Sequence, residues 1–223
     1  MITAAQFQER AHDMIELQLR RRGIRDERVL EAMLQVPRQE FVPPELVAAA
    51  YEDRPLPIGD RETISQPYMV ASMTEAARIE PGHRALEVGT GSGYQAAILA
   101  YLGAEVHTIE RNPRLVEAAR ERLARLGYRN VQVFSGDGSE GLAAHAPYNL
   151  IMVTAAAPSV SPALVDQLAE EGRLMVPVGD LYHQDLLLVI KHGGKMETHL
   201  LDACQFVPLI GKGGWPEKSL GYG

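Results

Sequence analysis

Three glycines that alternate with other residues mark the loop with the clearest chemistry. They stand in the stretch Glu-Val-Gly-Thr-Gly-Ser-Gly-Tyr, residues 87–94, after a short apolar run and before a helix-like segment. Glycine lets a backbone turn sharply and lets a ligand approach closely, so such a loop usually holds a phosphate or a nucleoside. The dinucleotide pattern G-x-G-x-x-G is not met, because its third glycine would fall at Tyr94. The loop therefore disfavours NAD.

Two further carboxylates favour a nucleoside ligand. Glu110 ends the next strand about 20 residues beyond the loop, a separation at which a carboxylate can accept hydrogen bonds from both ribose hydroxyls. Asp137, between Gly136 and Gly138, follows the third strand, where it could reach the amino group of an adenine. Each carboxylate alone could equally be a solvated charge or a helix cap. Three such features at consecutive strand ends make a nucleoside site the better interpretation.

The order acidic-x-G-x-G-x-G resembles the first motif of S-adenosylmethionine-dependent methyltransferases. The resemblance implies S-adenosyl-L-methionine as the cofactor and S-adenosyl-L-homocysteine as the product. From the motif and the two strand ends we expect the cofactor to be bound by Glu87, Gly89, Thr90, Gly91, Ser92, Gly93, Glu110, Asp137 and Gly138.

The elements that would position these residues follow from the patterning. Apolar runs at 84–88, 105–109, 131–134, 150–153 and 173–176 predict buried parallel strands, and helices are expected at 94–102, 112–126 and 162–169. Residues 185–190 and 197–201 predict a hairpin, and 203–209 a further strand. Strands that alternate with helices imply an α/β, doubly wound, mostly parallel Rossmann-like sheet with a C-terminal antiparallel hairpin or strand. Before residue 80 we expect a helical appendage, with Thr3 and Gln6 as a capping box and prolines that exclude long elements from 37 to 67.

Composition narrows the class of protein. The net charge of −7 argues against a nucleic-acid binder, and no apolar run approaches the roughly 20 residues of a membrane helix. The N-terminus lacks the order of a signal peptide, and the single cysteine cannot form an internal disulfide. We therefore expect a cytoplasmic monomer that binds neither nucleic acid nor membrane. The scattered histidines, including His107, predict no metal site.

Several stretches closely resemble protein-L-isoaspartate O-methyltransferases. The most specific is Thr-Ile-Ser-Gln-Pro-Tyr-Met at 63–69; others are Val-Pro-Arg at 36–38, Val-Thr-Ala-Ala-Ala-Pro at 153–158 and Phe-Val-Pro-Leu at 206–209. The resemblance covers residues 5 to 211. It divides the chain into an appendage with a substrate segment (1–80), a methyltransferase core (81–211) and a tail (212–223).

The resemblance implies a repair enzyme. Such enzymes methylate the free α-carboxylate of isoaspartyl residues in aged proteins and peptides, and the ester closes to a succinimide that hydrolyses in part to aspartate. It maps catalysis onto Ser65 and places Gln66, Pro67, Tyr68 and Met69 over the cofactor. Ile64, Ser65, Phe206 and Val207 would hold the substrate, the last two by strand addition or simply as a sheet strand.

The proposed chemistry suits the residues present. A carboxylate with a pKa near 4 is ionised at neutral pH, so no general base is needed. A neutral serine hydroxyl can hold one carboxylate oxygen and leave the other free to attack, whereas a cation would stabilise the ground-state anion. Without the flanking match, Ser65 would be a turn residue before Pro67.

The chain departs from the family pattern in three places, and the first keeps an alternative open. Asp60-Arg61-Glu62 stands where Tyr-Gly-Gln is common, Asn149 stands where aspartate is usual, and the tail from Lys212 to Gly223 extends past the resemblance. The first could alter the substrate mouth, and it is the feature that would favour a methyltransferase acting on another carboxylate or a small molecule.

Overall fold

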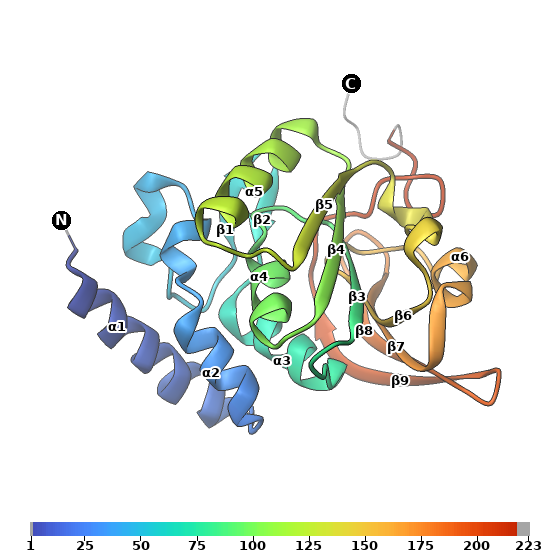
Figure 1. Cartoon of the computed structure of the whole chain (residues 1–223), viewed down its shortest axis with the longest axis horizontal. Helices are drawn as coiled ribbons and strands as arrows, with labels where there is room; N and C mark the ends of the chain where they lie inside the picture. Colours follow the sequence, from blue (N-terminus) through green and yellow to red (C-terminus); the bar gives the residue numbers. More distant parts are fainter. Residues whose placement is uncertain (1, 218–223) are drawn as a thin grey trace.

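The central sheet of this computed structural model, which describes residues 2–217, contains seven strands (Figure 1). They are β3 (Arg84–Val88), β4 (Glu105–Glu110), β5 (Val131–Ser135), β6 (Tyr148–Val153), β7 (Leu168–Gly179), β8 (Gln184–His192) and β9 (Lys195–Cys204). Their order across the sheet is β5-β4-β3-β6-β7-β8-β9. Strands β5 to β7 in this order run parallel, and β8 and β9 are antiparallel additions at one edge. The predicted doubly wound, mostly parallel sheet with a C-terminal hairpin is confirmed.

The strand order reverses beside β3. The chain passes outward from β3 to β4 and β5, and then returns to the other side of β3 as β6. Val88 at the end of β3 pairs with Ile109 on one side and Val153 on the other, so three strand ends lie level. A crevice outside the carboxyl ends of the strands forms at such a point, and the glycine loop opens into it.

Both faces of the sheet are buried at its centre, in β3 and β6. Ala85 and Leu150 belong to a core shared with the N-terminal helices, whereas their neighbours Leu86 and Ile151 belong to a second core on the opposite face. Successive side chains of a strand point to opposite faces, which explains the continuous apolar runs seen in the sequence.

The part of the chain that the structure describes contains six α-helices outside the sheet: α1 (Ala4–Asp13), α2 (Glu27–Gln35), α3 (Pro67–Ala77), α4 (Tyr94–Tyr101), α5 (Pro113–Arg125) and α6 (Pro162–Asp166). The predicted capping box starts α1, since the Gln6 N–H donates to Thr3 Oγ1 and the Thr3 N–H to Gln6 Oε1. The helical path continues through Met14–Leu19 and Arg20–Arg22 and ends at Gly23, whose φ is 101°.

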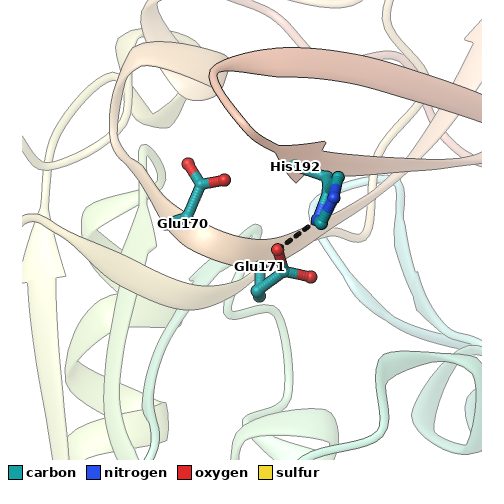
Figure 2. Close-up of side chains that lie close together, drawn as sticks. All are labelled: Glu170, Glu171 and His192. Atoms are coloured by element: carbon teal, nitrogen blue, oxygen red, sulfur yellow. Dashed lines mark hydrogen bonds and ion pairs between the residues drawn. The ribbon is translucent and has the colours of Figure 1, made fainter.

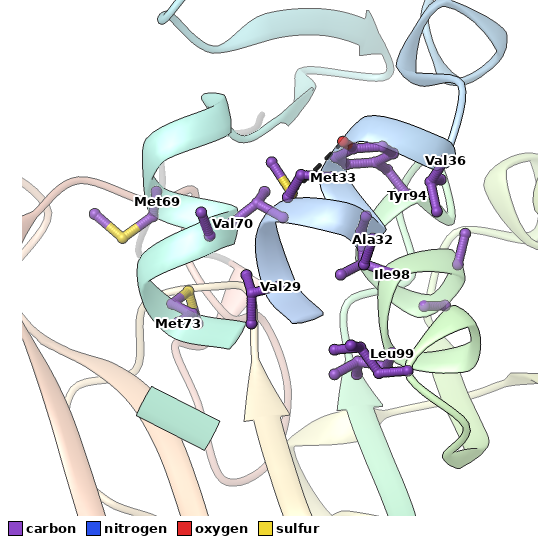
Figure 3. Close-up of a cluster of buried hydrophobic side chains, with 14 of the residues drawn as sticks. Val29, Ala32, Met33, Val36, Met69, Val70, Met73, Tyr94, Ile98 and Leu99 are labelled. Atoms are coloured by element: carbon purple, nitrogen blue, oxygen red, sulfur yellow. Dashed lines mark hydrogen bonds between the residues drawn. The ribbon is translucent and has the colours of Figure 1, made fainter. Parts of the chain in front are cut away.

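Helix α2 packs against α3 and α4, as Figure 3 shows. The buried side chains in this contact are Val29, Ala32 and Met33 of α2, Met69, Val70 and Met73 of α3, and Tyr94, Ile98 and Leu99 of α4. The Tyr94 hydroxyl donates to the sulfur of Met33 at 3.7 Å. The first third of the chain is thus outside the sheet, as expected, yet joined to its core.

A short hairpin, not foreseen from the sequence, precedes α3. It pairs β1 (Leu56–Gly59) with β2 (Glu62–Ile64), and a 3-10 helix at Pro44–Ala49 precedes it. Asp60 and Arg61 form the turn with φ values of 52° and 65°, in the left-handed region. The turn carries the residues that depart from the family pattern.

Two sequence predictions were wrong. The helix expected at 162–169 ends at Asp166, because Leu168 already pairs with Tyr148 in the sheet. The strand expected at 203–209 does not form, because β9 ends at Cys204 and the chain then leaves the ladder. There the Gln184 side chain accepts from the Phe206 N–H at 2.6 Å, in place of a strand partner. Of the predicted tail, residues 218–223 lie outside the described residues.

Among the described residues, no helix combines the length and the apolar character needed to cross a membrane.

Candidate active site

A cavity opens at the carboxyl ends of β3, β4 and β6. It brings together eleven of the residues predicted for the site: Ile64, Ser65, Glu87, Gly89, Thr90, Gly91, Ser92, Glu110, Gly138, Phe206 and Val207. These residues lie up to 143 positions apart in the sequence (64 to 207), and the predicted catalytic serine shares one cavity with the predicted cofactor loop.

The glycine loop needs its glycines. Gly89, Gly91 and Gly93 have φ values of 99°, 51° and 85°, which side chains strongly disfavour. A Cβ on Gly89 would lie 2.5 Å from Thr154 Oγ1, and that hydroxyl donates to the carbonyls of Gly89 and Val88. The loop is therefore fastened to the end of β6 and keeps its backbone open toward the cavity.

Only one of the two oxygens of the buried Glu87 carboxyl group accepts a hydrogen bond. Thr108 Oγ1 donates to Glu87 Oε2 at 2.5 Å and lies 2.6 Å from the Thr90 hydroxyl. Glu87 Oε1 is buried without a hydrogen-bond partner. Burial raises the pKa of Glu87 to about 8, and the charge of Glu110 adds to the effect. An unpaired acceptor in the cavity wall fits a ligand with a cationic or N–H donor, such as the ammonium group of S-adenosylmethionine.

Glu110 braces the glycine loop. Its Oε2 accepts from the Gly91 N–H at 3.0 Å, and its Oε1 accepts from the Asn112 N–H at 2.9 Å. The side chain is buried, and it lines the cavity at the end of β4. Each carboxylate oxygen keeps further lone-pair capacity, which is the arrangement expected for a pair of ribose hydroxyls.

Asp137 is held by protein groups. Its Oδ1 accepts from the N–H and hydroxyl of Ser139, and its Oδ2 accepts from the Lys212 N–H at 2.8 Å. Partial burial raises its pKa, but these hydrogen bonds outweigh that effect and lower the pKa below its usual value. Asp137 is not among the residues found to line the cavity, although its neighbour Gly138 is. A contact of Asp137 with adenine stays a prediction, and the bond to Lys212 gives the tail an anchor beside the site.

Ser65 stands between β2 and α3, half-buried at the cavity wall. Its carbonyl accepts from the Arg38 guanidinium at 2.6 Å, and the same guanidinium donates to the Ala50 carbonyl at 2.7 Å. Arg38 is wholly buried, with its guanidinium 4.8 Å from the centre of the Tyr94 ring. Burial lowers its pKa. A buried cation with no carboxylate partner is costly, and here it fixes the backbone that carries the predicted catalytic hydroxyl.

The residues after Ser65 form the start of α3. Gln66 is its N-cap, Pro67 its first residue, and Met69 lies in the core with α2. Tyr68 lies under the Arg22 guanidinium, 3.3 Å from the ring centre. None of these four predicted cofactor residues is among the residues found to line the cavity, whereas Val70 and Met73, one turn further on, are. Their contact with the cofactor stays a prediction.

Phe206 and Val207 line the cavity from a loop rather than from a strand. The Gln184 side chain bonds both the N–H and the carbonyl of Phe206, and the Val207 carbonyl accepts from the Ala156 N–H. Among the described residues, only the Val207 N–H of these four backbone groups has no partner. Substrate binding by strand addition stays a prediction, and the Val207 N–H is the donor of this segment that it could use.

The sequence reasoning missed Gln95 and Thr154 in the cavity wall. The Gln95 amide donates to the Thr74 hydroxyl at 3.0 Å. Thr154 stands directly after a predicted strand, in the same position relative to β6 that Gly89 has relative to β3. That strand-end position was the signal that could have identified it.

The described residues include one group that could hold a metal ion: Glu170, Glu171 and His192 (Figure 2). All three are exposed, and a hydrogen bond joins His192 to Glu171. This bond raises the pKa of His192 and ties the β8–β9 hairpin to β7.

His107, in contrast, is a buried residue of β4 whose ring centre lies 4.5 Å from that of His145.

Comparisons with known proteins agree along most of the chain. A family model described as Protein-L-isoaspartate(D-aspartate) O-methyltransferase (PCMT) matches residues 9–214. The protein-L-isoaspartate O-methyltransferase of Methanoculleus marisnigri is 54% identical over 203 residues, which is 91% of this chain and 92% of that protein. The Koribacter versatilis protein of the same name is 55% identical over 202 residues, 91% of each.

A solved structure from Plasmodium falciparum has the same fold. It is described as a protein-L-isoaspartate O-methyltransferase in complex with S-adenosyl-L-homocysteine. Its TM-score to this chain is 0.78 at 29% identity, over 92% of this chain and 98% of that one.

Proposed function

The chain belongs to the protein-L-isoaspartate(D-aspartate) O-methyltransferase family, and from this we infer that it methylates the free α-carboxylate of L-isoaspartyl residues. The methyl donor is S-adenosyl-L-methionine, which supplies an electrophilic methyl group on a sulfonium when bound. The ester product closes to a succinimide, and hydrolysis of the succinimide returns part of the damaged residues to aspartate. The substrates are proteins and peptides that contain isoaspartate.

The residues of this chain have to position the reactants. The substrate carboxylate is already an anion at neutral pH, so the reaction requires no proton to be removed before attack. What remains is to bring a carboxylate oxygen in line with the methyl group and to exclude water. Glu87, Glu110 and the glycine loop are assigned to the cofactor, and Ile64, Ser65 and Val207 to the substrate.

Ser65 is assigned as the catalytic residue. Its hydroxyl donates one hydrogen bond to a carboxylate oxygen and leaves the other oxygen to attack. The observation that supports this role most is that Ser65 lines the same cavity as Glu87 and Gly89, while its own backbone is held by Arg38. A hydroxyl on a fixed backbone provides the positioning that the reaction needs.

We also propose three functional parts of the chain. Residues 1–80 carry the substrate segment, residues 81–211 form the methyltransferase core, and the tail that begins at 212 covers the end of the site beside Asp137.

Replacement of Ser65 by alanine tests the catalytic assignment. Loss of one charge-assisted hydrogen bond predicts a fall in kcat of about 10–100-fold, with an unchanged Kd for S-adenosylhomocysteine. Ser92→Ala is the matched control, since Ser92 lines the cavity from the cofactor loop. It is expected to weaken S-adenosylhomocysteine more than it lowers kcat. If Ser65→Ala weakened S-adenosylhomocysteine in step with turnover, Ser65 would be a cofactor residue instead.

A further inference from the structure

A second hollow adjoins the active-site cavity. It lies between the turn of the β1–β2 hairpin, the start of α5 at Pro113, and the loop at residues 207–210. Glu62, Arg111 and Val207 are among the residues that line both hollows, so the two hollows are neighbours. A substrate that lies with its carboxylate at Ser65 therefore has this second hollow beside it.

Most charges around the second hollow are already paired. Asp60 bonds to the Asn112 amide at 2.8 Å and to Arg114 at 2.5 Å. Arg111 pairs with Glu217 at 3.1 Å. Arg61, which also lines the hollow, is engaged in an interaction of its own. These contacts fasten the hairpin turn to α5 and leave little free positive charge.

Glu62 is different. Its half-buried side chain has no hydrogen bond or ion pair among the residues that the structure describes. Burial raises the pKa of Glu62 to about 7, and nearby Glu110 and Asp60 push it the same way, while Arg111 opposes them. Glu62 thus makes no ion pair within the described part of the chain, although the Arg111 charge is near enough to act on it, and it borders both hollows.

We propose that the second hollow receives the side chain of a residue that neighbours the isoaspartyl residue, and that Glu62 selects a lysine or arginine there. The proposal rests on the proposed function of the site. Glu62 precedes Ser65 by three residues, or about 10 Å along an extended strand. One or two residues of an extended substrate, plus a lysine side chain, cover that distance.

The charge of Glu62 favours substrates with a positively charged neighbouring side chain over substrates with a negatively charged one. A substrate ammonium or guanidinium supplies the partner that Glu62 lacks, whereas a substrate glutamate is repelled by Glu62 and Glu110 together. A glutamine at position 62 could hydrogen-bond but could not attract charge. Selectivity for a cation therefore depends on the carboxylate of Glu62, and it strengthens as pH rises through 7 and Glu62 ionises.

Three isoaspartyl peptides that differ only in one flanking residue, lysine, alanine or glutamate, test the proposal. Separate sets place that residue before and after the isoaspartate. At pH 8 we expect the lysine peptide of one set, either before or after the isoaspartate, to have a kcat/KM about fivefold above that of the alanine peptide, as for a partly exposed ion pair. The glutamate peptide of that set should have a kcat/KM below that of the alanine peptide. At pH 6 the lysine preference shrinks. In Glu62→Gln the ratio falls to about one at both pH values, and the control Glu117→Gln, on the exposed side of α5, keeps the preference.

The outcomes separate this proposal from the function on which it rests. Equal lysine-to-alanine ratios in the wild type and in Glu62→Gln, with methylation intact, would overturn the subsite alone. Weaker binding of S-adenosylhomocysteine by Glu62→Gln, with equal losses for all peptides, would assign Glu62 to the cofactor and also overturn it. Methylation of none of the peptides by the wild type would overturn the proposed function and the subsite together.

Discussion

Arg38 offers the sharpest perturbation of the site without contact with either reactant. The substitution Arg38→Met keeps much of the side-chain volume and removes the guanidinium. The buried carbonyl of Ala50 and the part-buried carbonyl of Ser65 then lose their charged donor. We expect both the free energy of unfolding and the turnover to fall, because the same hydrogen bonds hold the fold and the catalytic backbone.

The expected loss in the free energy of unfolding follows from the two hydrogen bonds that Arg38 donates. An unsatisfied buried carbonyl costs roughly 1–3 kcal/mol, so two cost about 2–6 kcal/mol. Removing a buried cation offsets part of this, since burial disfavours the charged form of Arg38. We expect a net loss of about 2–4 kcal/mol. A shift of Ser65 by about 1 Å corresponds to a loss in kcat on the order of 100-fold, with little change in the KM for S-adenosylmethionine.

Urea unfolding and steady-state kinetics on an isoaspartyl peptide measure the two effects separately. Arg38→Lys retains one donor and a charge and is expected to recover part of the lost kcat. The matched control is Arg120→Met, because the Arg120 guanidinium also bonds a backbone carbonyl, that of Val133, but at an exposed position. Its kcat should stay at the wild-type value.

A folded Arg38→Met protein with reduced stability but normal kcat would refute the positioning role. Arg38 would then serve the fold alone, and the hydrogen bond to Ser65 would have no catalytic meaning.

Three further predictions concern the cofactor end of the site. Because the folded protein retains the Glu87 proton up to about pH 8 and the unfolded chain releases it near 4.5, stability falls as pH rises through that window. Glu87→Gln should flatten the change in urea midpoint between pH 6 and 8. Gly89→Ala, with its Cβ against Thr154, should lose about 2–4 kcal/mol of stability and weaken S-adenosylhomocysteine in calorimetry. Asp137→Ala should speed amide hydrogen exchange at Lys212, whose N–H loses its acceptor.

Regular, locally determined elements were predictable from the sequence. The strand at 84–88 and the helix that begins after Asn112 were confirmed, because a buried apolar run and a side-chain cap are local signals. The glycine loop lies at the predicted strand end and lines the cavity, while its binding of the cofactor stays a prediction.

Features that depend on distant partners were not predictable. Gln167 bonds the Leu142 N–H across 25 positions at the point where a helix was expected to continue, and Gln184 bonds Phe206 across 22 positions where a strand was expected. In the sequence, Arg38 is a basic residue next to a proline, and no local pattern predicts that it is buried. Its partners Ala50 and Ser65 lie 12 and 27 positions away, so its burial becomes visible only in the fold.

Methyl transfer from labelled S-adenosylmethionine to a matched pair of peptides tests the central claim most directly. One peptide carries isoaspartate and the other carries aspartate at the same position. Base-labile label on the isoaspartyl peptide alone is the predicted result. Label on neither peptide, with S-adenosylhomocysteine bound in a separate titration, or equal label on both, would contradict the account.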